Sequence, residues 1–124
     1  MIPLTPSEEK LMQLLWHRKK ALLKDLMADF PEPKPAKTTL ATLLKRLIDK
    51  NAVAYTTQGS ARSYYPLVSK SDYSKSSVSN LVSRFFNGSM AQLASYCTAQ
   101  DQLSTDELEQ LKEIIDIQLK RKES

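Results

Sequence analysis

The stretch AKTTLATLLKRLIDKN, residues 36–51, decides the fold. Its apolar residues recur at intervals of three and four, at Leu40, Leu43, Leu44, Leu47 and Ile48. In an α-helix this spacing gathers all of them into one core-facing stripe. The opposite side carries hydroxyls in the first turns and cations further along, so the first half can meet DNA bases and the rest phosphates. We interpret this stretch as a candidate recognition helix; an ordinary amphipathic helix with a solvated polar face is the alternative.

The polar side of this helix supplies the candidate DNA contacts. Geometry alone places three of them there: Lys37, Thr38 and Lys45. The helix start has no good N-cap, because Ala36 and Lys37 offer no side-chain acceptor to the first amides. Either Thr38 caps a slightly shorter helix, or those amides are left for a phosphate.

Two helices are predicted before this stretch. Thr5-Pro6-Ser7-Glu8 is a capping box with proline at the first helical position, and it starts a helix that runs to about Arg18. A second helix is predicted over residues 20–30. Pro31, Pro33 and Pro35 then stop it, since proline lacks an N–H and restricts the residue before it.

The period of the pattern changes from 3.6 to 2 after Asn51. Residues 52–57 and 62–68 read as two strands, joined by a turn at residues 58–61. Three helices followed by a hairpin is the order of a winged helix-turn-helix, which we assign to residues 1–68. The wing would bring Ser60 and Arg62 near the DNA backbone. The alternative is a hairpin that merely covers an edge of the core.

Three further helices are predicted in residues 69–124, each opened by a capping motif that begins at Ser69, Ser89 or Ser104. The fold class is thus mostly α with a small β-hairpin. The last helices carry more apolar surface than so small a lobe can cover, which favours a symmetric homodimer. The alternative is a lobe that packs back on the winged helix. The predicted interface residues are Tyr73, Val78, Leu81, Val82, Phe85, Phe86, Leu93, Leu108, Leu111, Ile114 and Ile115.

Charge is distributed unequally along the chain. Residues 1–68 contain 11 Lys and Arg against 6 Asp and Glu, a net charge of +5, whereas residues 69–124 contain 7 against 8, a net charge of −1. The basic excess therefore lies in the part that holds the candidate recognition helix, which indicates a polyanionic partner there.

Composition limits the cellular setting. A single cysteine, Cys97, excludes an internal disulfide framework and fits a reducing compartment. No apolar run approaches the ~20 residues that a membrane span needs, and the start of the chain has no signal-peptide pattern. We expect a cytoplasmic protein without membrane insertion.

Catalytic chemistry is not indicated. His17, the one histidine, stands among Arg18, Lys19 and Lys20 with no acid or thiol beside it, and the two glycines are too few for a phosphate-cradling loop. The acidic residues of the last helix read as a solvated face, not as a catalytic pair. We expect no enzyme, no metal site and no cofactor.

Four stretches together resemble the penicillinase-repressor family, the β-lactam-responsive and copper-responsive bacterial repressors. They are LTPSEEKLMQLLW at residues 4–16, TTLATLLKRLIDKN at 38–51, YYPLVSKSDY at 64–73 and FNGSMAQL at 86–93. The resemblance implies a dimeric repressor on a dyad operator in double-stranded DNA. It also implies that Thr39 and Thr42 contact bases and that Arg46 contacts the backbone.

The sequence departs from the family pattern in the wing and at the positions through which the family's repressors respond to their inducing signal. The family commonly has Gly-Arg followed by aromatics in the wing, whereas here Gly59-Ser60-Ala61 displaces the arginine to position 62. In the β-lactam branch a membrane sensor protease cuts an Asn-Phe bond, and the corresponding pair here is Tyr96-Cys97. The copper branch uses a cysteine cluster, which one cysteine cannot form.

Two functions remain open from the sequence. The favoured one is a dimeric winged-helix repressor; the alternative is a winged-helix protein-interaction module that does not bind DNA. The uneven charge speaks against the second, because an adaptor has no need to segregate charge in this way. Activation instead of repression would give the same sequence features.

Overall fold

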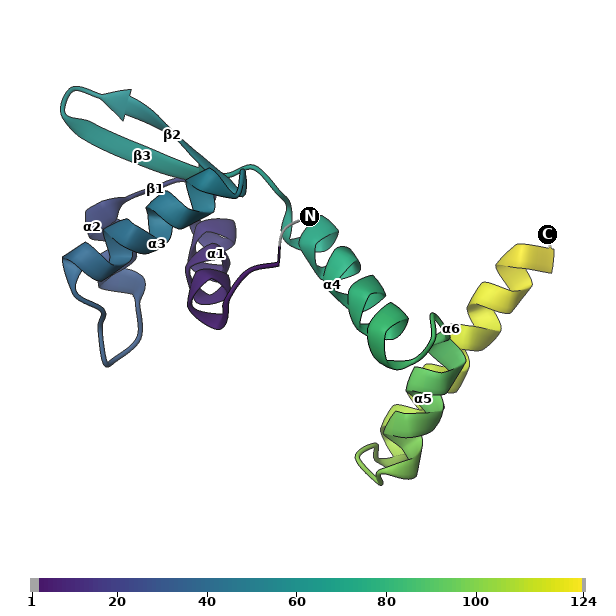
Figure 1. Ribbon diagram of the computed structural model, residues 1–124. Helices are drawn as coiled ribbons and strands as arrows, with labels where there is room; N and C mark the ends of the chain where they lie inside the picture. The colour runs from purple at the N-terminus through teal and green to yellow at the C-terminus, as the bar shows by residue number, and fades with distance from the viewer. Residues whose placement is uncertain (1–2, 124) are drawn as a thin grey trace. The chain divides into compact units, whose positions relative to one another are not determined.

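A computed structural model describes residues 3–123, which form six helices and one three-stranded sheet (Figure 1). The chain divides into two compact units, Met1–Val78 and Ser79–Ser124. In chain order the elements are α1 (Pro6–Arg18), β1 (Ala21–Leu22), α2 (Leu23–Asp29), α3 (Lys37–Asp49), β2 (Val53–Gln58), β3 (Ala61–Pro66), α4 (Lys70–Phe85), α5 (Met90–Ala99) and α6 (Thr105–Glu123).

The core of the first unit forms where α1, α2 and α3 pack together beneath the sheet. The apolar stripe of α3 faces inward as predicted, and only Ile48 stays half-buried. α1 contributes three fully buried apolar side chains, and α2 and β2 add one each: Leu11, Met12, Leu15, Leu26 and Val53. Burying a side chain of this size stabilises the fold by roughly 1.5–3 kcal/mol. The recognition candidate is therefore anchored along its whole length.

The sheet has the strand order β1-β3-β2, with both neighbouring pairs antiparallel. β2 and β3 form the predicted hairpin, in which Gln58 pairs with Ala61 across a two-residue turn. Gly59 has φ +63°, as the first central residue of a type II′ hairpin turn requires, and glycine adopts this conformation at little cost. Three helices with this hairpin confirm the predicted winged helix-turn-helix.

The predicted helix over residues 20–30 is wrong at its start. Ala21 and Leu22 form β1, which pairs with Tyr64 and Ser63 of β3, and the helix begins only at Leu23. A strand of two residues is too short to show a period of two, and its partners lie about forty residues further along the chain. Tertiary pairing therefore overrides the local helical pattern.

The helix starts follow the capping motifs. Thr5 and Glu8 form the full capping box of α1, and the hydroxyls of Ser69, Ser89 and Ser104 each accept a hydrogen bond from a backbone amide three residues on. α3 is different. Its N-cap is Ala36, which makes no side-chain hydrogen bond, so Thr38 is not the cap.

The second unit holds the end of α4 together with α5 and α6. The units divide inside α4, whereas the sequence places a boundary before this helix. Neither α5 nor α6 contains a buried residue between positions 90 and 123. Within residues 3–123, no helix combines the length and the apolar character that crossing a membrane requires.

Candidate nucleic-acid interface

The six predicted DNA contacts on α3 all lie on its exposed face. They are Lys37, Thr38, Thr39, Thr42, Lys45 and Arg46. The buried stripe fixes the rotation of the helix, and this rotation turns the hydroxyls and cations outward. The helix therefore presents a continuous polar surface with short side chains in its first half and long cationic ones in its second.

Two details define the chemistry of the start of α3. The Thr42 hydroxyl donates to the backbone carbonyl of Thr38 over 2.9 Å, so its proton is used within the helix and its oxygen can serve a ligand only as an acceptor. No side chain caps the helix at Ala36, which excludes the alternative in which Thr38 caps a shorter helix and leaves the amides of the first turn without a side-chain acceptor. Amides at a helix start are suited to a phosphate oxygen.

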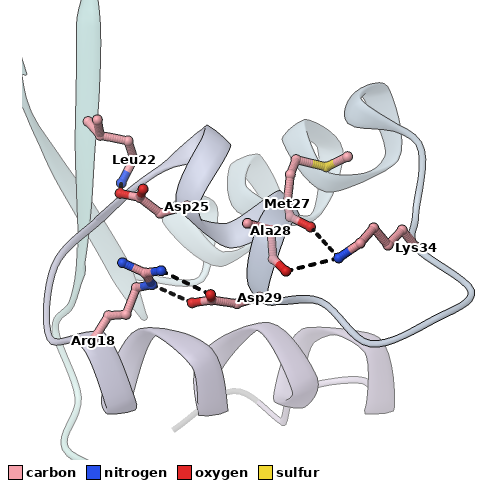
Figure 2. Close-up of polar contacts among 7 residues, drawn as sticks. All are labelled: Arg18, Leu22, Asp25, Met27, Ala28, Asp29 and Lys34. Atoms are coloured by element: carbon pink, nitrogen blue, oxygen red, sulfur yellow. Dashed lines mark hydrogen bonds and ion pairs between the residues drawn. The ribbon is translucent and has the colours of Figure 1, made fainter.

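The turn before α3 is fixed by polar contacts that the sequence does not reveal (Figure 2). The ammonium group of Lys34 donates to the carbonyls of Met27, Ala28 and Phe30 over 3.0, 2.9 and 2.8 Å. One cation thus satisfies three carbonyls at the end of α2, where the helix dipole is negative. Because Lys34 belongs to the segment that leads into α3, this contact sets where the recognition candidate begins.

A second set of contacts in the same view holds α2 against α1 (Figure 2). The Arg18 guanidinium forms a bidentate ion pair with Asp29, and the hydrogen bond from Arg18 lowers the pKa of that carboxyl. At the other end of α2, the Leu22 amide donates to Asp25 over 3.0 Å. Both ends of the short helix are therefore fixed.

A buried ion pair joins the start of α1 to the end of α3. The Glu8 carboxylate is fully buried, and its Oε1 accepts from the Lys50 ammonium at 2.6 Å and from the Thr5 amide at 2.7 Å. Burial raises the pKa of this carboxyl, but the hydrogen bonds from Lys50 and from the Thr5 backbone outweigh it and hold the pKa below its ordinary value. The carboxylate therefore stays charged inside the fold.

The wing carries the other two predicted contacts. Ser60 lies in the hairpin turn and Arg62 lies at the start of β3, and both are exposed. The hairpin end and the N-terminal end of α3 project to the same side of the first unit (Figure 1). The start of α3 and the tip of the wing therefore lie on the same side of the first unit, as a duplex that runs along both elements would require.

A hollow between the wing and α2 adds a residue that the sequence reasoning missed. Ser60 and Arg62 line this hollow together with Lys24, the second residue of α2. A single lysine in a helix of seven residues does not by itself indicate a DNA contact. Lys24 joins the interface only because β1 brings the start of α2 beside β3.

The predicted dimer residues fall into two groups. Tyr73 packs its ring on Trp16 with 5.8 Å between ring centroids, and Val82 is buried. Phe86 and Leu93 are half-buried. The others are 42 to 67 % exposed: Val78, Leu81, Phe85, Leu108, Leu111, Ile114 and Ile115.

The remaining predicted positions lie on α5 and α1. The Tyr96–Cys97 bond is inside α5, with Tyr96 exposed and Cys97 half-buried. His17 is exposed near the end of α1. Residues 3–123 contain no group of three or more His, Cys, Asp and Glu side chains that could hold a metal ion.

An exposed helix with hydroxyls and cations beside a wing defines the class: a DNA-binding protein of the winged-helix type. The penicillinase repressor family model matches residues 4–117. The chain belongs to the penicillinase repressor family.

The chain is similar to individual relatives and to one solved structure. The penicillinase repressor of Bacillus licheniformis is 25% identical over 120 residues, covering 96% of this chain and 94% of the relative. The methicillin resistance regulatory protein MecI of Staphylococcus aureus (strain N315) is 25% identical over 113 residues, covering 90% and 92%. A solved structure of the CopR repressor aligns with a TM-score of 0.47 and 26% identity, over 54% of this chain and 99% of that one.

Proposed function

We propose that this chain is a transcriptional repressor that binds a dyad operator in double-stranded DNA as a homodimer. The observation that carries the proposal is the exposed set of hydroxyls and cations on α3, a helix whose start projects to the same side of the first unit as the wing. Family membership supplies the repressor activity. Such a protein works beside the chromosome, so the proposal places it in the cytoplasm.

The interface residues divide their work between bases and phosphates. Thr39 and Thr42 contact base edges; because the Thr42 proton is used by the Thr38 carbonyl, the Thr42 oxygen accepts from a base amino group, and its methyl suits thymine. The cations contact phosphates and supply most of the affinity, independently of sequence. On α3 these are Lys37, Lys45 and Arg46, with Thr38 at the first turn; in the wing, Ser60 and Arg62 reach the adjacent backbone.

Dimerisation through the second unit is supported by the two apolar faces of α6. Leu108, Leu111, Ile115 and Leu119 recur at helical spacing on one stripe, and Ile114 and Ile117 lie on another side of the helix. All six are at least 42 % exposed in the single chain. A lone helix with two uncovered stripes needs more than one neighbour, and a second copy of this lobe supplies it.

Light scattering after gel filtration at micromolar concentration tests the dimer. A particle of twice 14.1 kDa is expected. A species of single-chain mass across the whole concentration range would overturn it.

DNA binding is tested by fluorescence anisotropy with the DNA upstream of the chain's own gene and with a scrambled duplex, over a salt series. We expect tighter binding to the upstream fragment, a steep salt slope and a two-fold footprint with half-sites about one helical turn, roughly 34–36 Å, apart. Equal and weak binding to both duplexes would overturn the repressor and favour a protein-interaction module.

Two variants test whether Thr42 contacts bases and Arg46 contacts phosphates. Thr42→Ala should cost about 1–3 kcal/mol on the upstream operator and little on scrambled DNA, whereas Arg46→Ala should weaken both alike and flatten the salt slope. Equal losses of Thr42→Ala on both duplexes would contradict the role of Thr42 as a base contact.

A proteolytic off-switch at Tyr96–Cys97, driven by a membrane sensor protease, completes the proposal. The bond lies in a helix of ten residues without buried side chains, so opening this helix for a protease costs little. Mass spectrometry of the chain from β-lactam-treated cells should show a fragment that ends at Tyr96. An intact chain in cells that have relieved repression would exclude this switch.

A further inference from the structure

A series of aromatic and cationic contacts runs along one face of the hairpin, from the core toward the turn. Tyr64 is buried, and Tyr55 lies directly opposite it on β2 with 5.8 Å between the ring centroids. The guanidinium of Arg62 then lies over the Tyr55 ring, with its Cζ 4.3 Å from the centroid. The core tyrosine thus supports Tyr55, and Tyr55 supports the wing arginine.

The register of the hairpin explains why these three side chains meet. Arg62 and Tyr64 are two residues apart on β3 and therefore share a face, and their partners Thr57 and Tyr55 lie on that same face. Arg62 is the diagonal neighbour of Tyr55, within reach of a long side chain. An arginine at position 60 or 61 would lack this contact, since residue 60 lies in the turn and residue 61 faces the other side.

Stacking changes how an arginine can bind. A guanidinium that lies on a ring is attracted by its π-system, and its N–H donors remain available at the edge. Its rotamer is also restricted before a ligand arrives, so less conformational entropy is lost when it binds. The stacked Arg62 is consequently prepared to donate to a phosphate oxygen.

The place where Arg62 is held also fits a phosphate. The hollow between the wing and α2 has two cations and a hydroxyl in its lining, Arg62, Lys24 and Ser60, and the rest of the lining is Leu22, Leu23, Ala61 and Tyr64. A DNA backbone that follows the wing passes this hollow, and the two cations there neutralise its charge.

We propose that Tyr55 is a positioning residue for DNA binding: its ring holds the Arg62 guanidinium at the hollow shared with Lys24, where both cations contact the DNA backbone. This inference rests on the proposed function. It also accounts for the displaced wing arginine, because position 62 is the one that reaches the Tyr55 ring.

A double-mutant cycle tests the proposal with the full chain and a labelled DNA duplex of random sequence. Tyr55→Leu should lower the affinity about two- to fivefold, the range expected for one exposed cation–π contact. Arg62→Ala should lower it at least as much and reduce the salt slope by about 0.9. In the Arg62→Ala background, Tyr55→Leu should have no further effect, because Tyr55 acts through the arginine.

Conservative variants separate positioning from general packing. Tyr55→Phe keeps the ring and should bind like the parent chain, whereas Arg62→Lys keeps the charge but not the planar stack and should lose affinity. Tyr65→Leu is the matched control, since it removes the other wing tyrosine that lies near a cation, Lys20 at 5.8 Å. It should leave the coupling between Tyr55 and Arg62 unchanged.

A DNA-free measurement distinguishes failure of this inference from failure of the proposed function. The Arg62 δ-protons should show an upfield ring-current shift in the NMR spectrum of the parent chain and Tyr55→Phe, and not in Tyr55→Leu. Additive losses in the cycle, or an unshifted Arg62, would overturn the role of Tyr55 alone. A parent chain that binds no duplex while Arg62 is shifted would overturn the proposed function, and the DNA-binding role of Tyr55 with it.

Discussion

Helices α3 and α6 both repeat apolar residues at helical spacing, but these residues are buried in α3 and exposed in α6. Leu40, Leu44 and Leu47 of α3 are at most 1 % exposed, whereas Leu111, Ile114 and Ile115 of α6 are 43 to 57 % exposed. The difference lies in the neighbours: α3 is enclosed by α1, α2 and the sheet of its own chain. An apolar stripe thus identifies a buried face without saying which chain buries it.

The polar sides of α3 and α6 also differ, in the charge that they expose. α3 exposes hydroxyls and cations in a part of the chain with net charge +5, and α6 exposes mainly carboxylates in a part with net charge −1. The proposed DNA-binding face of α3 and the proposed dimer face of α6 need different chemistry, because one would meet a polyanion and the other a copy of itself. The first unit therefore exposes a polar, cationic surface, and the second unit exposes an apolar surface flanked by charged side chains.

The largest expected effect follows from breaking the surface of α6. Ile115→Lys places a charge in its apolar stripe, and we expect dissociation into single chains and a loss of about 100-fold or more in affinity for a two-half-site operator, because the second half-site contact is lost. Analytical ultracentrifugation and anisotropy measure the two effects. Glu113→Lys, on the carboxylate side of the same helix, is the control and should remain dimeric.

Truncating the enclosed stripe should act on folding instead of assembly. Leu44→Ala leaves a cavity among fully buried neighbours and should lower the free energy of unfolding by about 2–5 kcal/mol, as urea denaturation would show. Leu111→Ala is the matched change in α6. The loss in unfolding free energy caused by Leu111→Ala should rise with protein concentration, since a second chain must first cover the site. A concentration-independent loss of equal size would contradict the contrast between the helices.

Removing the buried charge at Glu8 should reveal how the stability of the first unit depends on pH. Glu8→Gln removes the negative charge that pairs with Lys50 and should cost about 2–3 kcal/mol near neutral pH. Because the folded pKa of Glu8 is lowered, its stabilising contribution is present above the ordinary glutamate pKa and disappears as pH falls below about 4. The unfolding curves of parent and variant should therefore converge in acid. Exposed Glu113→Gln should show no such convergence.

The smallest expected effect concerns the turn before α3. Lys34→Met removes three hydrogen bonds from the end of α2 and should lower the unfolding free energy by about 1 kcal/mol, with a parallel loss of DNA affinity as α3 loses its fixed start. Calorimetry and anisotropy would measure both. Lys75→Met, an exposed lysine of α4, should change neither; a variant with weakened DNA binding and unchanged stability would show that Lys34 contacts DNA directly.

Local chemistry determined much of the fold in advance. The stripe of α3, the capping box at Thr5 and Glu8 and the serine caps of α4, α5 and α6 involve residues at most a few turns apart, so they can be read directly from the chain. The same periodicity placed all six α3 candidates on the exposed face. Their contacts with DNA stay a prediction.

Only the tertiary structure decided the contacts between distant segments. β1 exists because Ala21 and Leu22 meet β3, Lys50 reaches Glu8 from 42 residues away, and Arg62 finds Tyr55 through the register of the hairpin. None of these pairs leaves a periodic signal, since each depends on where packing brings two backbones together. The sequence determined which faces are apolar and which helices begin where; the packed core decided which polar side chains meet.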